Sequence, residues 1–262
     1  MTIDEQSFVI DCGEGPGFLL NGEFRSLSSM TPVQKELRKY ASEERRKVNL
    51  RFFKTGKGQY GEGDQFIGVT VPDTRIVAKK FANISFEEIR PLLDSPIHEE
   101  RLVGLLILVG QYQKGDEQTR KEVFDFYLQN VEHVNNWDLV DLSADKIVGA
   151  HLEKEKNRKL LDILSRSPHL WKKRIAIVST LHFIRKKEFR DTFRITDNLM
   201  NDPHDLLHKA CGWMLREVGK KDEHALNSFL QSRYQRMPRT MLRYSIERFS
   251  PAARKKYLEG EI

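Results

Sequence analysis

The segments RLVGL, DLVDL, RIAIV, KACGW and RYSIE, which begin at residues 101, 138, 174, 209 and 243, decide the fold. They are the most apolar helical stretches of the chain, and their starts lie 37, 36, 35 and 34 residues apart. A period of this size has room for two antiparallel helices and two turns. The spacing predicts an all-α fold of repeated helix pairs. The alternative is a chance alignment, since helices of any all-α protein recur about every 15 to 20 residues.

The repeat length is close to that of HEAT and armadillo repeats, whose helix pairs stack into a curved solenoid with a long concave face. Four of the five segments begin with a cation, namely Arg101, Arg174, Lys209 and Arg243. Evenly spaced cations on a concave face favour an extended polyanion as the ligand. We therefore expect a HEAT-like α-solenoid with a concave basic face. The alternative is that these charges belong to an ordinary solvated helical surface.

Two regions are expected along the chain. Residues 1–29 contain four glycines between positions 13 and 22 and show no sustained period, so we predict a poorly structured N-terminal extension. Residues 30–262 are predicted to form the solenoid domain, and no strand with period-2 alternation is recognised. Local signals indicate helix starts at Thr31-Pro32, at 71–73 and at Ser85 with Glu88 in a capping box, and a glycine-rich loop at 56–68.

The composition excludes several classes of protein. The longest uncharged stretch, residues 102–113, is too short to span a membrane, and the N-terminus lacks the pattern of a signal peptide. The two cysteines, Cys12 and Cys211, form neither a disulfide framework nor a zinc motif, so we expect a cytoplasmic protein. The net charge is +6, and residues 170–262 carry 20 Lys and Arg against 11 Asp and Glu. Such an excess is typical of a protein that binds phosphate backbones.

The second repeat departs from the cationic pattern at residues 135–141, NNWDLVD. On a helix Trp137 and Asp141 share a face, with Asp145 one turn further along. A carboxylate on a DNA-binding face repels phosphates, so another role is needed. Cleavage of a glycosidic bond supplies one, because positive charge develops on the sugar as the base departs. The alternative is that Asp141 forms a structural salt bridge with Arg174 and that Trp137 belongs to the core.

Two other motifs are weak. GKGQYG at 56–61 matches the glycine fingerprint of dinucleotide-binding proteins, but no strand precedes it and no βαβ unit surrounds it. His204 and His208 have the spacing of a zinc pair, but a glutamate next to the first histidine and a third ligand are missing. We expect neither a metal nor an organic cofactor.

Four segments, in order, resemble the AlkD-like family of DNA alkylation repair glycosylases. They are RFFKTGKGQYGEGDQFIGVTVPDTR at 51–75, NNWDLVD at 135–141, LWKKRIAIV at 170–178 and KACGWMLREVGK at 209–220. The resemblance extends from about residue 30 to the C-terminus. It implies a HEAT-like solenoid that binds duplex DNA and removes cationic alkylated purines, such as N3-alkyladenine and N7-alkylguanine, by hydrolysing the N-glycosidic bond.

The resemblance also implies the site residues. The catalytic aspartate of the family matches Asp141, its paired tryptophan matches Trp137, a DNA-contacting arginine matches Arg174 and a second aromatic matches Trp213. Asn136 stands where some members have a second tryptophan, a difference that bears on lesion preference. Further DNA contacts are expected from cations of the repeats and of the matched segments: Arg101, Lys209, Arg216, Arg243, Lys54 and Lys57.

We therefore expect a monofunctional DNA glycosylase of base excision repair that acts as a monomer on duplex DNA containing alkylated bases, away from membranes. Asp141 is expected to stabilise the charged sugar and to position water. The alternative function is a non-catalytic HEAT-repeat scaffold that binds DNA structures or proteins.

Overall fold

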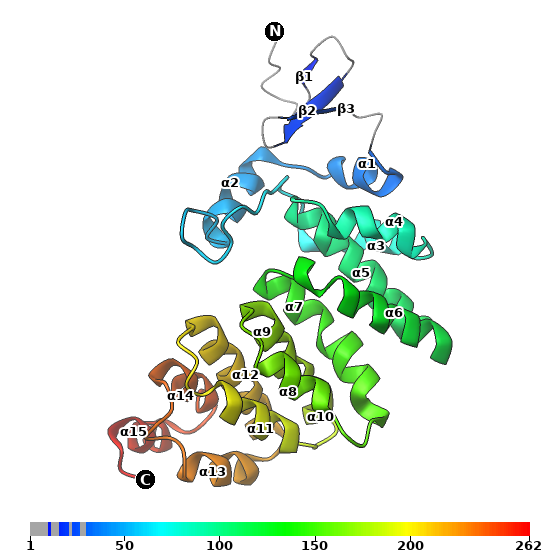
Figure 1. Ribbon diagram of the computed structural model, residues 1–262. Helices are drawn as coiled ribbons and strands as arrows, with labels where there is room; N and C mark the ends of the chain where they lie inside the picture. The colour runs from blue at the N-terminus through cyan, green and yellow to red at the C-terminus, as the bar shows by residue number, and fades with distance from the viewer. Residues whose placement is uncertain (1–9, 12–15, 21–22, 27–29) are drawn as a thin grey trace. The chain divides into compact units, whose positions relative to one another are not determined.

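The structure, a computed structural model, describes residues 10–11, 16–20, 23–26 and 30–262. The chain divides into two units, Met1–Ile107 and Leu108–Ile262, which are treated separately below (Figure 1). Every regular element described after residue 30 is a helix. Within the described ranges, no helix is both long enough and apolar enough to cross a membrane. The predicted all-α fold is confirmed for residues 30–262.

A small antiparallel sheet precedes the helices. It consists of β1 (Ile10–Asp11), β2 (Pro16–Leu20) and β3 (Glu23–Ser26), in the order β1-β2-β3. Its register pairs Ile10 with Gly17 and Phe18 with Arg25. The sheet lies within the extension predicted to be poorly structured, whose other residues lie outside the described ones, and no strand was predicted there. Strands of two to five residues are too short to show a sustained alternation of apolar and polar residues.

Most helix boundaries of the first unit follow from capping residues. Thr31 and Gln34 form a capping box at the start of the first helix, and Ser85 and Glu88 form the predicted one at the fourth. The helices are α1 (Pro32–Arg38), α2 (Glu43–Phe52), α3 (Val71–Lys80), α4 (Phe86–Leu93) and α5 (His98–Lys114), which continues into the second unit. Fully buried apolar side chains of all but α2 form the core, among them Leu37, Val77, Ile89, Leu92 and Val103.

The first turn of α5 is polar and yet buried. Glu99, which is 1% exposed, accepts hydrogen bonds from the backbone N–H groups of Ile67, Gly68 and Val69, at 3.1, 2.9 and 3.3 Å. Gly68 has a φ of +78°, and a Cβ atom there would lie 2.0 Å from the carbonyl oxygen of Ser42. The end of the glycine-rich loop is therefore fixed between α5 and the residue that caps α2.

The second unit contains the remaining helices. They are α6 (Glu117–Gln129), η2 (Val131–His133), α7 (Trp137–Ser143), the π-helical turn η3 (Asp145–Gly149), η4 (Leu152–Lys154), α8 (Lys159–Ser165), α9 (Leu170–Ser179), α10 (Leu181–Arg185), α11 (Arg190–Leu199), α12 (Asp205–Lys221), α13 (Glu223–Gln231), α14 (Arg239–Ser245) and α15 (Pro251–Glu259).

The predicted repeat corresponds to a row of packed helices in this unit. The repeat segments that begin at residues 138, 174, 209 and 243 lie on α7, α9, α12 and α14, and each of these helices packs against the next (Figure 1). A second set of helices accompanies the row, because α8 packs on α9 while α11 and α13 pack on α12. This alternation of helix pairs is the predicted α-solenoid arrangement.

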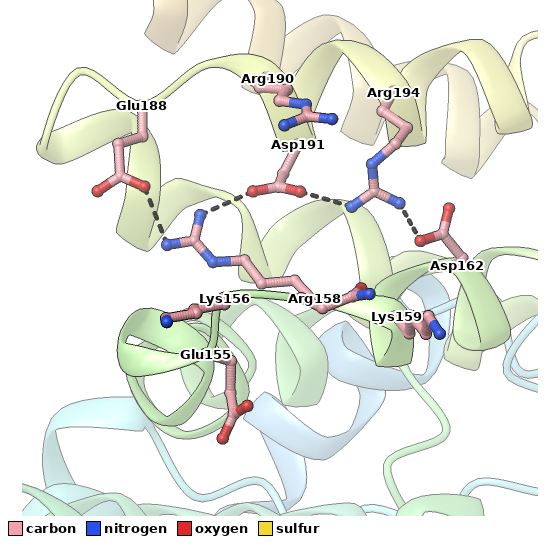
Figure 2. A pocket seen from close by; sticks show the side chains of 10 residues that line it. Glu155, Lys156, Arg158, Lys159, Asp162, Glu188, Arg190, Asp191 and Arg194 are labelled. Carbon is pink, nitrogen blue, oxygen red and sulfur yellow. Dashed lines mark hydrogen bonds and ion pairs between the residues drawn. The ribbon is translucent and has the colours of Figure 1, made fainter.

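A ladder of ion pairs joins α8 and α11 (Figure 2). Arg158 contacts Glu188 at 2.9 Å and Asp191 at 2.7 Å, and Arg194 bridges Asp191 to Asp162. These side chains line a surface cavity of about 690 Å³. Because the ladder already pairs Arg158 and Arg194 and the cavity is lined by none of the predicted site residues, we assign the ladder a structural role.

Candidate active site

The helix that carries Asp141 begins at a buried asparagine. Asn136 is 0% exposed and caps α7, and its Oδ1 accepts a 2.8 Å hydrogen bond from the backbone N–H of Trp137. Trp137 is the first residue of α7, so Asp141 follows one turn later on the same side of the helix. Asn136 therefore fixes where this helix begins, a role that the sequence analysis did not assign to it.

Asp141 forms a two-pronged ion pair with Arg174. Arg174 donates from Nε to Oδ1 at 2.9 Å and from Nη2 to Oδ2 at 2.8 Å. Its remaining Nη1 group donates to the backbone carbonyl of Leu206 at 2.8 Å. Since these groups lie on α9, α7 and α12, one guanidinium holds three successive helices of the row together. The parallel hydrogen bonds also fix the plane of the carboxylate.

The carboxylate is accessible while the guanidinium is not. The side chain of Asp141 is 20% exposed, whereas that of Arg174 is 7% exposed. Burial raises the pKa of the Asp141 carboxyl above its usual range, and the neighbouring Arg174 charge opposes this rise by favouring the anion. The arrangement holds a partly exposed carboxyl group in a fixed orientation.

Two tryptophans lie on helices that meet at Arg174. Trp137, on α7, and Trp213, on α12, are both partly exposed. Trp213 donates from Nε1 to Glu217 at 3.2 Å, and it lies two turns after Leu206, whose carbonyl binds Arg174. Part of each tryptophan side chain therefore lies at the protein surface.

Two of the predicted DNA contacts are corrected by burial. Arg101 is 3% exposed, ion-paired to Asp64, and donates to the carbonyl of Ser95 at 2.8 Å. Arg174 is 5% exposed, and all of its donor-bearing nitrogens are engaged by Asp141 and Leu206. Neither guanidinium is available to a phosphate. Both instead act inside the fold, where an unpaired charge would be costly.

The other predicted cations lie at the surface. Lys209 pairs with Asp205 at 2.7 Å, and Arg216 pairs with Glu247, both in ion pairs that phosphates can displace. Arg243, Lys54 and Lys57 are exposed. Lys54, Lys57 and Arg101 belong to the first unit, and the remaining predicted site residues belong to the second.

Asp145 is buried, although regular helical spacing places it one turn beyond Asp141 on the same face. It lies in the π-helical turn η3, is 1% exposed, and is paired to Arg185 at 2.5 Å and to Lys146 at 3.3 Å. It therefore belongs to the interior of the unit. A π-helical turn after α7 changes the register of the residues that follow Asp141, which a regular helical spacing does not anticipate.

Comparisons with known proteins give the family and the fold of this chain. Residues 33–249 match the family described as DNA alkylation repair enzyme. A solved structure described as a predicted DNA alkylation repair enzyme from Enterococcus faecalis shares the fold, with a TM-score of 0.63 and 15% sequence identity. The alignment covers 80% of this chain and 97% of that one. No curated protein matches the sequence.

Proposed function

Because this chain belongs to the DNA alkylation repair enzyme family, we propose that it is a monofunctional DNA glycosylase. Its substrates are cationic alkylated purines in duplex DNA, such as N7-alkylguanine and N3-alkyladenine. The observation that supports this most is the accessible Asp141 carboxylate, held by the buried Arg174 on a helix that also presents Trp137.

The proposed reaction requires little more than a carboxylate held beside C1′ of the deoxyribose. A cationic base leaves with the electrons of the C1′–N bond and departs neutral, so no acid has to protonate it. Positive charge develops on the deoxyribose as the bond breaks, and a fixed carboxylate beside C1′ stabilises that charge. Water then adds its oxygen to C1′ and releases one proton, for which Asp141 is the nearby base.

Arg174 acts in this proposal as a positioning residue. It holds both oxygens of Asp141 and favours the ionised form of that carboxyl, and its own side chain is buried. Trp137 and Trp213 supply flat apolar faces, from the two helices α7 and α12 that pack against α9, and a deoxyribose can pack on these faces.

The test is base release. Purified protein is incubated with a duplex containing N7-methylguanine and with the same duplex unmodified, and free base and abasic sites are measured. The proposal expects methylated base and abasic sites in equal amounts from the first duplex and none from the second. Strand cleavage in place of an intact abasic site would contradict the monofunctional assignment.

The Asp141–Arg174 pair also favours a second candidate, a non-catalytic scaffold that binds DNA structures or proteins. An ion pair joining three helices serves a scaffold as well as an enzyme. Binding of damaged duplex without any base release, at protein concentrations above the DNA, would support the scaffold.

A further inference from the structure

Helix α2 (Glu43–Phe52) contains no buried residue, although it lies in a folded unit. Ser42 caps it, and Glu43 and Glu44 occupy its first turn. A ten-residue helix with so little burial is marginal in water. It is kept in place at its start, where the backbone N–H of Ser42 donates to the carbonyl of Ile67 at 3.1 Å. The helix thus displays a fixed surface.

This surface exposes two large apolar side chains on one face. Val48 is 51% exposed and Phe52 is 61% exposed, and they stand one helical turn apart. The neighbouring Phe53 is buried and stacks on Phe66 with ring centroids 5.0 Å apart. The ring of Phe52 meets that of Phe53 edge-on at 5.1 Å, so one phenylalanine anchors the end of the helix and the other faces outward.

Cations surround these apolar side chains. Arg45 and Arg51 on the helix, and Lys54 and Lys57 in the loop that follows, are exposed. Among the described residues, none of the four lies within ion-pair distance of a carboxylate. By contrast, Lys47 pairs with Glu43 at 3.8 Å. Uncompensated cations at this density are the footprint of a polyanion-binding surface.

We propose that this surface, formed by Arg45, Val48, Arg51, Phe52, Lys54 and Lys57, binds the sugar-phosphate backbone of DNA. Its four cations contact phosphates, and Val48 and Phe52 pack on deoxyriboses. The inference rests on the proposed function only in taking DNA as the polyanion.

The chemistry of the surface favours this ligand over a protein or a lipid bilayer. Phosphates and apolar sugar faces alternate along a DNA strand, as cations and apolar side chains do here. Two apolar side chains are too few for a stable protein interface. They are also too few for an amphipathic helix that inserts into lipid.

The glycine-rich loop supports the same surface. Glu99 fixes its end through three backbone N–H groups, and Gly68 packs directly against Ser42. Lys54 and Lys57 therefore extend from a segment that is anchored at both sides, by Phe53 and by Glu99. A surface that is already ordered loses less entropy when it binds.

The test measures binding of an undamaged duplex over a range of salt concentrations, by fluorescence anisotropy. The double variant Arg45→Gln/Arg51→Gln is compared with Arg75→Gln/Lys79→Gln, which removes two exposed cations from α3 in the same unit. Log affinity falls linearly with log salt concentration, and each phosphate contact contributes about 0.9 to the steepness of that line. The α2 variant loses two contacts, so its line is expected to be shallower by about 1.8 than that of the wild type. The α3 control is expected to keep the wild-type slope.

Phe52→Ser tests the apolar contact separately. It is expected to weaken binding about fivefold at every salt concentration and to leave the slope unchanged. Equal slopes for the α2 and α3 double variants would overturn the inference. The inference would also be overturned if the α2 double variant lost binding to vesicles of phosphatidylcholine and phosphatidylserine while its DNA binding remained that of the wild type. Thermal unfolding confirms that each variant is folded.

The two proposals fail in different ways. If wild-type protein releases no base but the α2 variants still change the salt slope, only the glycosylase proposal is wrong. If base is released and the α2 slope matches that of the control, only the present inference is wrong.

Discussion

The Asp141 carboxylate is the residue on which the chemistry depends, and its surroundings act in opposite directions. Removal from water favours its neutral form, and Arg174 favours its anion. Burial has the larger effect, so the pKa lies above its usual value of 3.8. A site that needs the anion therefore begins to lose activity at a higher pH than an exposed aspartate would.

This balance predicts a pH profile. The rate of base release is expected to fall as the pH drops through the raised pKa of Asp141, so the acid limb has its midpoint above 3.8. Arg174→Gln removes the charge that favours the anion and is expected to move this limb further upward. Single-turnover rates across pH, with spontaneous base loss subtracted, provide the measurement. An acid limb at the same pH in both proteins would show that the rate does not depend on this carboxyl.

Asn136 gives a stability prediction at the same scale. Asn136→Ala removes the cap of α7 and is expected to lower the free energy of unfolding by about 1 kcal/mol. Asn135→Ala is a matched control, because the buried Oδ1 of Asn135 has no hydrogen-bond partner among the described residues. Urea unfolding of both variants is the measurement. An equal loss in the two would show that the cap contributes nothing specific.

At the scale of elements, the row of helices α7, α9, α12 and α14 depends on close approach. Gly212 lies on α12, where an added Cβ would be 2.7 Å from the backbone carbonyl oxygen of Met241 and 2.5 Å from Cβ of Tyr244. A backbone atom cannot rotate away as a side chain can. The glycine in the repeat segment KACGW is therefore required by packing against α14.

Gly212→Ala is accordingly expected to destabilise the protein by about 1 to 3 kcal/mol, because α12 and α14 must move apart. Gly110→Ala, on α5, is the control, since a Cβ there meets nothing within 4 Å and alanine favours a helix. Thermal melts of the two variants are expected to shift in opposite directions. A common downward shift would indicate a general sensitivity of these helices to substitution.

The elements also show what the sequence can and cannot predict. Caps such as Thr31 and Ser85 act over three residues, so they are readable directly, and the starts of α1 and α4 were predicted correctly. No helix start was predicted at Ser42, although α1 ends at Arg38 and Ser42 caps α2.

At the scale of the whole molecule, the repeat period was predictable because it is a property of the sequence itself. Which cations of the repeat segments are buried in ion pairs was not predictable in this way. Arg101 and Arg174 look like surface charges until Asp64 and Asp141, 37 and 33 residues away, are brought beside them. Several other cations of residues 170–262 are likewise paired with acids that precede residue 170, including Lys172 with Glu132 and Arg185 with Asp145.

The basic excess of the C-terminal region therefore overstates the positive charge that it offers to a ligand. The uncompensated cations of α2 and its loop lie instead in the N-terminal half, where the overall composition gave no indication of them. The net charge of one stretch of sequence locates a binding surface only after its ion pairs with acids from other parts of the chain have been taken into account.

The central claim is that Asp141 carries the chemistry, and Asp141→Asn tests it most directly. This change keeps the shape of the side chain and removes its charge. In single-turnover release of N7-methylguanine, with DNA binding measured in parallel, the account predicts a rate about 10²- to 10³-fold below wild type and an affinity that is not reduced. A variant that releases the base at the wild-type rate would contradict it.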